Sequence, residues 1–115
     1  MEAILKTRIL AGVAFAQVEA HESSKRYGRW DEPRDLAGAF SLVHRDAARA
    51  LEMITVGNGP SSKLGKDFTR AEEVLADIII RILDIAGGKN LHVAAALVAK
   101  MEYNELQSLV IKKDY

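Results

Sequence analysis

The chain has 115 residues, the usual length of one domain, and its hydrophobic content of 49% is enough to form a core. Its 16 basic residues balance its 16 acidic ones, so no net charge draws it towards nucleic acid or an anionic membrane. Cysteine is absent, which excludes disulfides and thiolate metal sites, and the polar side chains within residues 1–20 exclude a signal peptide or a membrane span. We expect a single domain over residues 1–115, in a cytoplasmic protein with no nucleic-acid or membrane partner.

The first predicted helix covers residues 2–23, where apolar residues recur near three-and-four spacing and mark one apolar face. Its polar end, which includes His21, is interpreted as a solvated helix terminus. Residues 24–34 form a predicted loop because glycine and proline punctuate them. Trp30 in this loop is either a lid on the core or a base-stacking surface. The lid is favoured because a lone aromatic side chain usually serves packing.

The second predicted helix covers residues 35–54, and either Asp31 or Asp35 is placed to cap its start. Asp46 lies inside the apolar face of this helix, with apolar residues one turn away on both sides. Arg49 lies at the edge of the same face, one turn further along. A carboxylate is almost never buried without a partner, so Asp46 is a candidate functional residue.

The third predicted helix follows a polar loop over residues 55–66 and is the most apolar part of the chain. Thr69 and Glu72 fit a capping box, S/T-x-x-E, at its start, and Gly87 and Gly88 are expected to stop it. Between these signals apolar residues face nearly every direction, which is typical of a buried helix. A single four-helix chain is not expected to cover such a helix alone, so we expect a homo-oligomer. No stretch shows the alternation of a β-strand.

Four charged residues interrupt the third helix at spacings of four, four and three, which places them on one narrow stripe. They are Glu73, Asp77, Arg81 and Asp84. If these carboxylates and Asp46 face one interior, they form an oxygen-only site of the kind found in helix bundles, which favours Mg²⁺ or Mn²⁺. Such a metal activates water for attack on phosphorus, which indicates hydrolysis of a phosphoanhydride. The alternative is a set of buried ion pairs with Arg49 and Arg81 as counter-ions, and residue types alone leave both open.

The last predicted helix covers residues 91–110, with Asn90 as a suitable N-cap. Lys100 and Asn104 are four residues apart and share one of its faces. The lysine pair at 112–113 either contacts phosphate or stabilises the C-terminus of the helix. The four predicted helices give an all-α fold.

Three segments in unbroken order resemble the MazG-like all-α nucleoside triphosphate pyrophosphohydrolases, and together they cover roughly residues 28–104. They are GRWDEPRDLAGAFSLVHRDAARALEMI, FTRAEEVLADIIIRILDIAGG and AAALVAKMEYN. The resemblance implies a helical bundle that assembles as a homodimer or homotetramer. It also implies Mg²⁺-dependent cleavage of a nucleoside triphosphate to the monophosphate and pyrophosphate. In the family the metal is held by E-x-x-E on one helix and E-x-x-D on the next.

The sequence departs from the family pattern at these metal ligands. The first motif falls on Asp46 and Arg49, so a cation replaces one expected carboxylate. The second motif falls on Val74 and Asp77, and valine cannot ligate a metal. The ligands implied for a rearranged metal site are Asp46, Glu73, Asp77 and Asp84, of which the first three are also the implied catalytic residues. The implied substrate-binding residues are Trp30, Lys100 and Asn104.

Two hypotheses follow from this departure. In the first, the protein is a Mg²⁺-dependent nucleotide pyrophosphohydrolase with an altered metal site. In the second, it has lost catalysis and either binds a nucleotide or serves as an interaction or structural module. Arg49 would then pair with Asp46 or Asp77 and fill the place of the metal.

Overall fold

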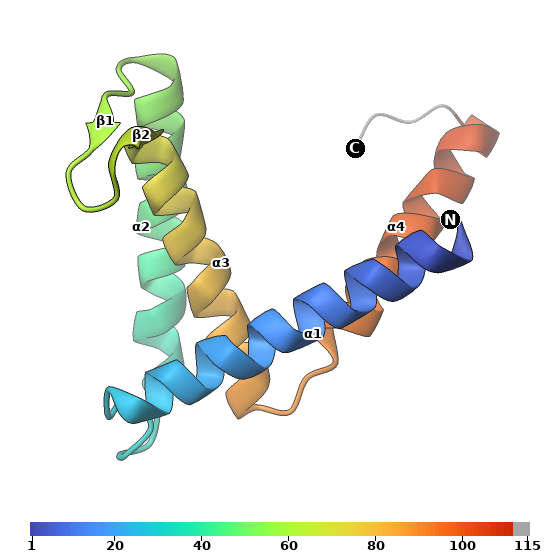
Figure 1. Cartoon of the computed structure of the whole chain (residues 1–115), viewed down its shortest axis with the longest axis horizontal. Helices are drawn as coiled ribbons and strands as arrows, with labels where there is room; N and C mark the ends of the chain where they lie inside the picture. Colours follow the sequence, from blue (N-terminus) through green and yellow to red (C-terminus); the bar gives the residue numbers. More distant parts are fainter. Residues whose placement is uncertain (112–115) are drawn as a thin grey trace.

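The computed structural model describes residues 1–111 and consists of four helices and one small hairpin (Figure 1). The elements are α1 (Ala3–Arg26), α2 (Leu36–Thr55), β1 (Pro60–Ser61), β2 (Gly65–Thr69), α3 (Arg70–Gly88) and α4 (Val93–Ile111). All four predicted helices are confirmed, and their observed ends lie within three residues of the predicted ones. The lysine pair at 112–113 lies outside the described residues.

The hairpin between α2 and α3 was not predicted. Its strands β1 and β2 pair in antiparallel fashion, with an irregular register next to Ser61. β1 has only two residues, so no alternation of polar and apolar side chains can reveal it. The fold is therefore mostly helical with one two-stranded sheet, rather than purely all-α.

The helix α3 contacts more elements than any other helix. It packs against α2 and against α1, while α4 packs against α1. In Figure 1, α2 and α3 form one arm and α1 and α4 form a second arm, and the two diverge from the end of α3. The radius of gyration is 16.5 Å, whereas a compact domain of this length has about 13 Å. The described chain is therefore open rather than globular.

Local side-chain bonds fix where two of the helices begin. Thr69 and Glu72 form the predicted capping box at the start of α3, each side chain bonding the other's backbone N–H. The bond from the Thr69 N–H also holds the pKa of Glu72 below its ordinary value. At the start of α2 the cap is Asp35, whose carboxylate accepts a hydrogen bond of 2.9 Å from the Gly38 N–H.

The predicted end of α3 is wrong. Gly87 and Gly88 lie inside the helix, and the chain leaves it through Asn90, which has a left-handed φ of 54°. The Leu91 N–H then bonds the Ala86 carbonyl at 2.9 Å, which is the long bond of a Schellman ending. Asn90 therefore ends α3 instead of capping α4, and the two helices meet at an angle of 117°. No single helix within residues 1–111 is long and apolar enough to cross a membrane, although this bent pair passes that test when taken together.

The two glycines serve packing. A Cβ atom on Gly87 would lie 2.7 Å from the Cβ of His21 in α1, and one on Gly88 would overlap the ring of Trp30. Their lack of a side chain lets α3 approach α1 closely. Packing has thus outweighed the cost of placing glycine within a helix.

The apolar core is small. Its largest cluster lies between α2 and α3 and consists of Ala50, Met53, Ala71 and Val74, with Ile78 packed against it. The opposite side of α3 is uncovered, because Ile79 is 58% exposed and Ile80 is 54% exposed. The single chain therefore leaves part of this apolar helix uncovered, as its sequence predicted.

We predict opposite effects of one substitution at two helical glycines. Gly88→Ala should lower the free energy of unfolding by about 1–3 kcal/mol, because the new methyl group overpacks against Trp30. Gly12→Ala in α1 is the matched control, since apart from the adjoining turns of its own helix nothing lies within 4 Å of its added Cβ. It should instead raise stability by about 0.5–1 kcal/mol. Urea unfolding at one protein concentration measures both, and equal midpoints for the two variants would refute this account of Gly88.

Candidate functional site

Asp46 is the most deeply buried charged residue of the arm formed by α2 and α3. It belongs to the face of α2 that also carries Ala39, Ala50 and Met53, and only 2% of it is exposed. That face packs against α3. The sequence prediction that Asp46 faces the core is confirmed.

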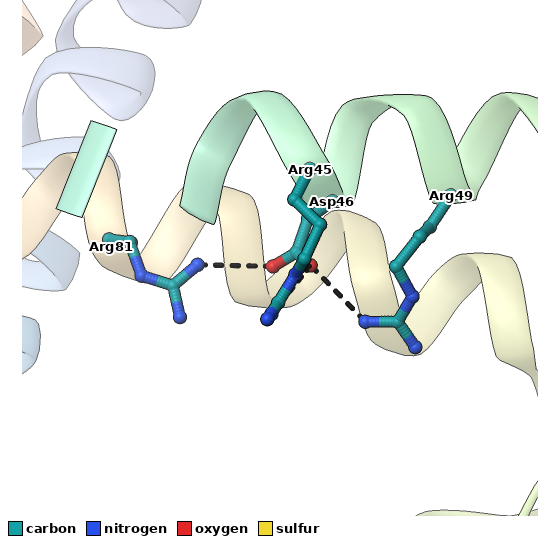
Figure 2. A network of polar contacts seen from close by, with 4 residues as sticks. All are labelled: Arg45, Asp46, Arg49 and Arg81. Carbon is teal, nitrogen blue, oxygen red and sulfur yellow. Dashed lines mark hydrogen bonds and ion pairs between the residues drawn. The ribbon is translucent and has the colours of Figure 1, made fainter. Parts of the chain in front are cut away.

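Three arginines hold the carboxylate of Asp46 (Figure 2). Arg45 and Arg49, from α2 itself, donate to its Oδ1 at 3.0 and 3.2 Å. Arg81, from α3, donates to its Oδ2 at 3.1 Å. Both carboxylate oxygens are thus engaged by guanidinium groups, and Arg81 ties the two helices together through this charge.

The arginines decide the charge state of Asp46. Burial alone would raise the pKa of this carboxyl, but the hydrogen bonds from Arg45, Arg81 and Arg49 outweigh burial and lower its pKa below the ordinary 3.8. Asp46 is therefore ionised at neutral pH. With three guanidinium groups around one carboxylate, the cluster remains positively charged.

Asp84 is a second buried carboxylate, 3% exposed, near the C-terminal end of α3. Its oxygens accept hydrogen bonds from the Ser24 hydroxyl at 2.7 Å and the Trp30 indole N–H at 2.8 Å. His21 Nδ1 lies 3.0 Å from Oδ1, and an Arg34 nitrogen lies 3.7 Å from Oδ2. Asp84 therefore joins α3 to α1 and to the loop that follows it.

The partners of Asp84 were missed from the sequence. His21 was interpreted as part of a solvated terminus, yet its side chain is only 17% exposed and contacts Asp84. Because α1 continues to Arg26, His21 and Ser24 lie three residues apart on one helical face. This spacing of two polar residues on one face of α1 is the sequence signal that could have identified them as partners of a buried acid on another helix. Trp30 packs edge-on to His21 with ring centroids 5.0 Å apart, which agrees with the lid interpretation.

The other predicted site residues lie apart from these two carboxylates. Glu73 accepts a hydrogen bond from the Ser61 hydroxyl of the hairpin. Asp77 is exposed and makes no ion pair among the described residues. Lys100, whose ammonium lies 4.6 Å from the Tyr103 ring centroid, and Asn104 belong to α4 on the other arm (Figure 1).

The structure does not bring these carboxylates together, and the ion-pair alternative holds for Asp46 with Arg49 and Arg81. Along α3, Glu73 contacts the hairpin, Arg81 contacts α2 and Asp84 contacts α1. Within residues 1–111 no group of three or more acidic or histidine side chains is arranged to hold a metal ion. Both oxygens of Asp46 already accept from arginine, so these residues do not fit the magnesium site that the resemblance implies.

Comparisons of the chain with known protein families, with curated proteins and with solved structures found no match. The function is therefore inferred from the chain's own charges, burial and contacts. Those contacts show a positively charged cluster on α2 and α3, and a buried acid that fastens α1 to α3.

We predict that Asp46 stabilises the fold in a pH-dependent way. The pKa of Asp46 is lower in the folded state than in the unfolded state. Its contribution to the free energy of unfolding is therefore fully present above the unfolded pKa near 3.9. That contribution is lost as the pH falls through the folded pKa. At neutral pH, Asp46→Asn should cost about 1–3 kcal/mol in unfolding free energy, the usual worth of hydrogen bonds to a charged group. The difference from the wild type should shrink as the pH falls below about 4.

The matched control is Asp77→Asn, an exposed acid on the adjoining helix. It should change stability by no more than about 0.5 kcal/mol. Denaturant unfolding of the three proteins at several pH values makes the comparison. A variant Asp46→Asn as stable as the wild type at pH 7 would contradict the structural role of the cluster.

Proposed function

We propose that the chain is a MazG-like helical subunit that has lost metal-dependent hydrolysis and serves as an interaction module in a homo-oligomer. The observation that carries the proposal is the network around Asp46. This residue stands where the family resemblance expects a metal ligand, and arginines occupy both of its oxygens.

Charge and geometry both oppose a metal at this position. Mg²⁺ needs free carboxylate oxygens in a near-octahedral arrangement. A divalent cation near Asp46 would instead meet three guanidinium groups, whose repulsion is strong at short range. Val74, at another expected ligand position, is 3% exposed and belongs to the apolar cluster between α2 and α3. The site has therefore become part of the helix packing.

Uncovered apolar surface supports the interaction role. Large hydrophobic side chains are more than half exposed on every helix, among them Phe15 on α1, Leu51 on α2, Ile79 on α3 and Leu106 on α4. Apolar surface of this extent marks an interface. A second copy of the chain fits best, because the open arms and the small core leave the single chain without the burial that a domain of its length normally has.

The catalytic part of the proposal is tested by pyrophosphate release from a panel of ribo- and deoxyribonucleoside triphosphates. The wild type should give no metal-dependent release with Mg²⁺ or Mn²⁺ compared with a chelator. Restoring two carboxylates with Arg49→Glu and Val74→Glu should raise Mg²⁺ affinity in calorimetry, since ligand charge and number set that affinity. Metal-dependent release by the wild type that disappears in Asp77→Ala would instead establish the alternative, a hydrolase with a rearranged site.

The oligomeric part is tested by sedimentation equilibrium. The wild type should have a mass that is a multiple of the 12.6 kDa chain. Ile79→Glu places a charge on the uncovered side of α3 and should raise the dissociation constant of the oligomer at least tenfold. Lys66→Glu on the hairpin is the control and should leave that constant unchanged. A wild type that remains monomeric at high concentration would refute the interaction role.

A further inference from the structure

A cavity of about 140 Å³ lies between α1, the loop that follows it, and α3. Three arginines from two segments line it: Arg29 and Arg34 from the loop after α1, and Arg81 from α3. Ser23, Ser24, Asp77 and Asp84 complete its polar lining. Apart from Arg81, which also bonds Asp46, the residues of this cavity have no part in the Asp46 network.

Arg34 carries an unused donor at this cavity. Its Nε is buried and has no hydrogen-bond partner among the described residues. The same guanidinium lies 5.7 Å from the Trp30 ring centroid and 3.7 Å from an Asp84 oxygen, which is too far for a hydrogen bond. A buried N–H without an acceptor is rare in folded proteins and calls for an explanation.

The acids in the lining do not neutralise the arginines. Asp84 already accepts from Ser24 and Trp30, and His21 lies against the same carboxylate. Arg29 makes no ion pair within residues 1–111, and its guanidinium lies over the Tyr27 ring at 5.4 Å. Asp77 is the remaining acid, and it is exposed to solvent. Arg81 also donates to Asp46. The lining nevertheless carries three guanidinium groups against two carboxylates, and the Arg34 Nε donor has no acceptor among the described residues.

We propose that this cavity binds a phosphate group directly, without a metal ion. Guanidinium groups match the oxygens of phosphate, and three of them, from the loop after α1 and from α3, line this one pocket. The bound phosphate accepts from the guanidinium groups of Arg29, Arg34 and Arg81, and the Ser23 hydroxyl adds a further donor. The proposal holds whether the chain is an interaction module or a hydrolase, because it uses neither Asp46 nor a metal.

The experiment titrates inorganic phosphate and pyrophosphate into the full chain, by calorimetry and by the fluorescence of Trp30, the only tryptophan. Sodium acetate and sodium chloride at the same ionic strength are the comparison salts. We expect saturable binding of phosphate or pyrophosphate that acetate does not reproduce. Arg34→Met should weaken this binding at least tenfold, while Arg8→Met, an exposed arginine on α1, should leave it unchanged.

A third variant sharpens the test. Asp77→Asn should tighten phosphate binding several-fold, because it removes the acid that repels the anion, whereas a metal-dependent site would lose its ligand from the same change. If Arg34→Met fails to fold, as judged by circular dichroism, Arg29→Met takes its place because Arg29 is exposed. No saturable binding at millimolar phosphate, equal binding of acetate, or binding insensitive to the arginine variants would each overturn the proposal.

Discussion

Burying the charge of Asp46 between α2 and α3 is the constraint on which the site depends. A carboxylate removed from water needs compensating cations, and here guanidinium groups supply them. The same compensation means that both oxygens of Asp46 already accept from guanidinium groups. Ion pairing within the fold and metal binding thus compete for the Asp46 carboxylate, and in this structure the carboxylate accepts from arginines.

The second buried acid gives α3 its other attachment. Asp84 fastens α3 to α1 through Ser24 and Trp30, while Gly87 and Gly88 provide the space for that approach. A helix held at one end by α1 and along its length by α2 leaves its remaining side uncovered. The two polar attachments thus accompany an open shape, whose exposed apolar surface is the basis of the proposed interaction with another copy of the chain.

Local chemistry in the sequence predicted the helices well, since the capping box of Thr69 and Glu72 and the Asp35 cap depend only on neighbouring residues. The stripe on α3 shows where prediction failed. Regular spacing establishes that Glu73, Arg81 and Asp84 share a face, but it does not determine which element covers each turn of it. Gly87 and Gly88 were misjudged for the same reason, because their neighbours, His21 on α1 and Trp30 in the loop after it, lie far away in the sequence.

The most direct measurement of the central claim is a crystal structure of the wild-type chain soaked in Mn²⁺ at neutral pH. The anomalous signal of manganese would locate any bound ion independently of the interpretation of the site. The account predicts that Asp46 remains bonded to Arg45, Arg49 and Arg81, with no manganese peak beside it. A manganese peak on Asp46 with the arginines turned away would contradict the claim that guanidinium groups have taken the place of the metal.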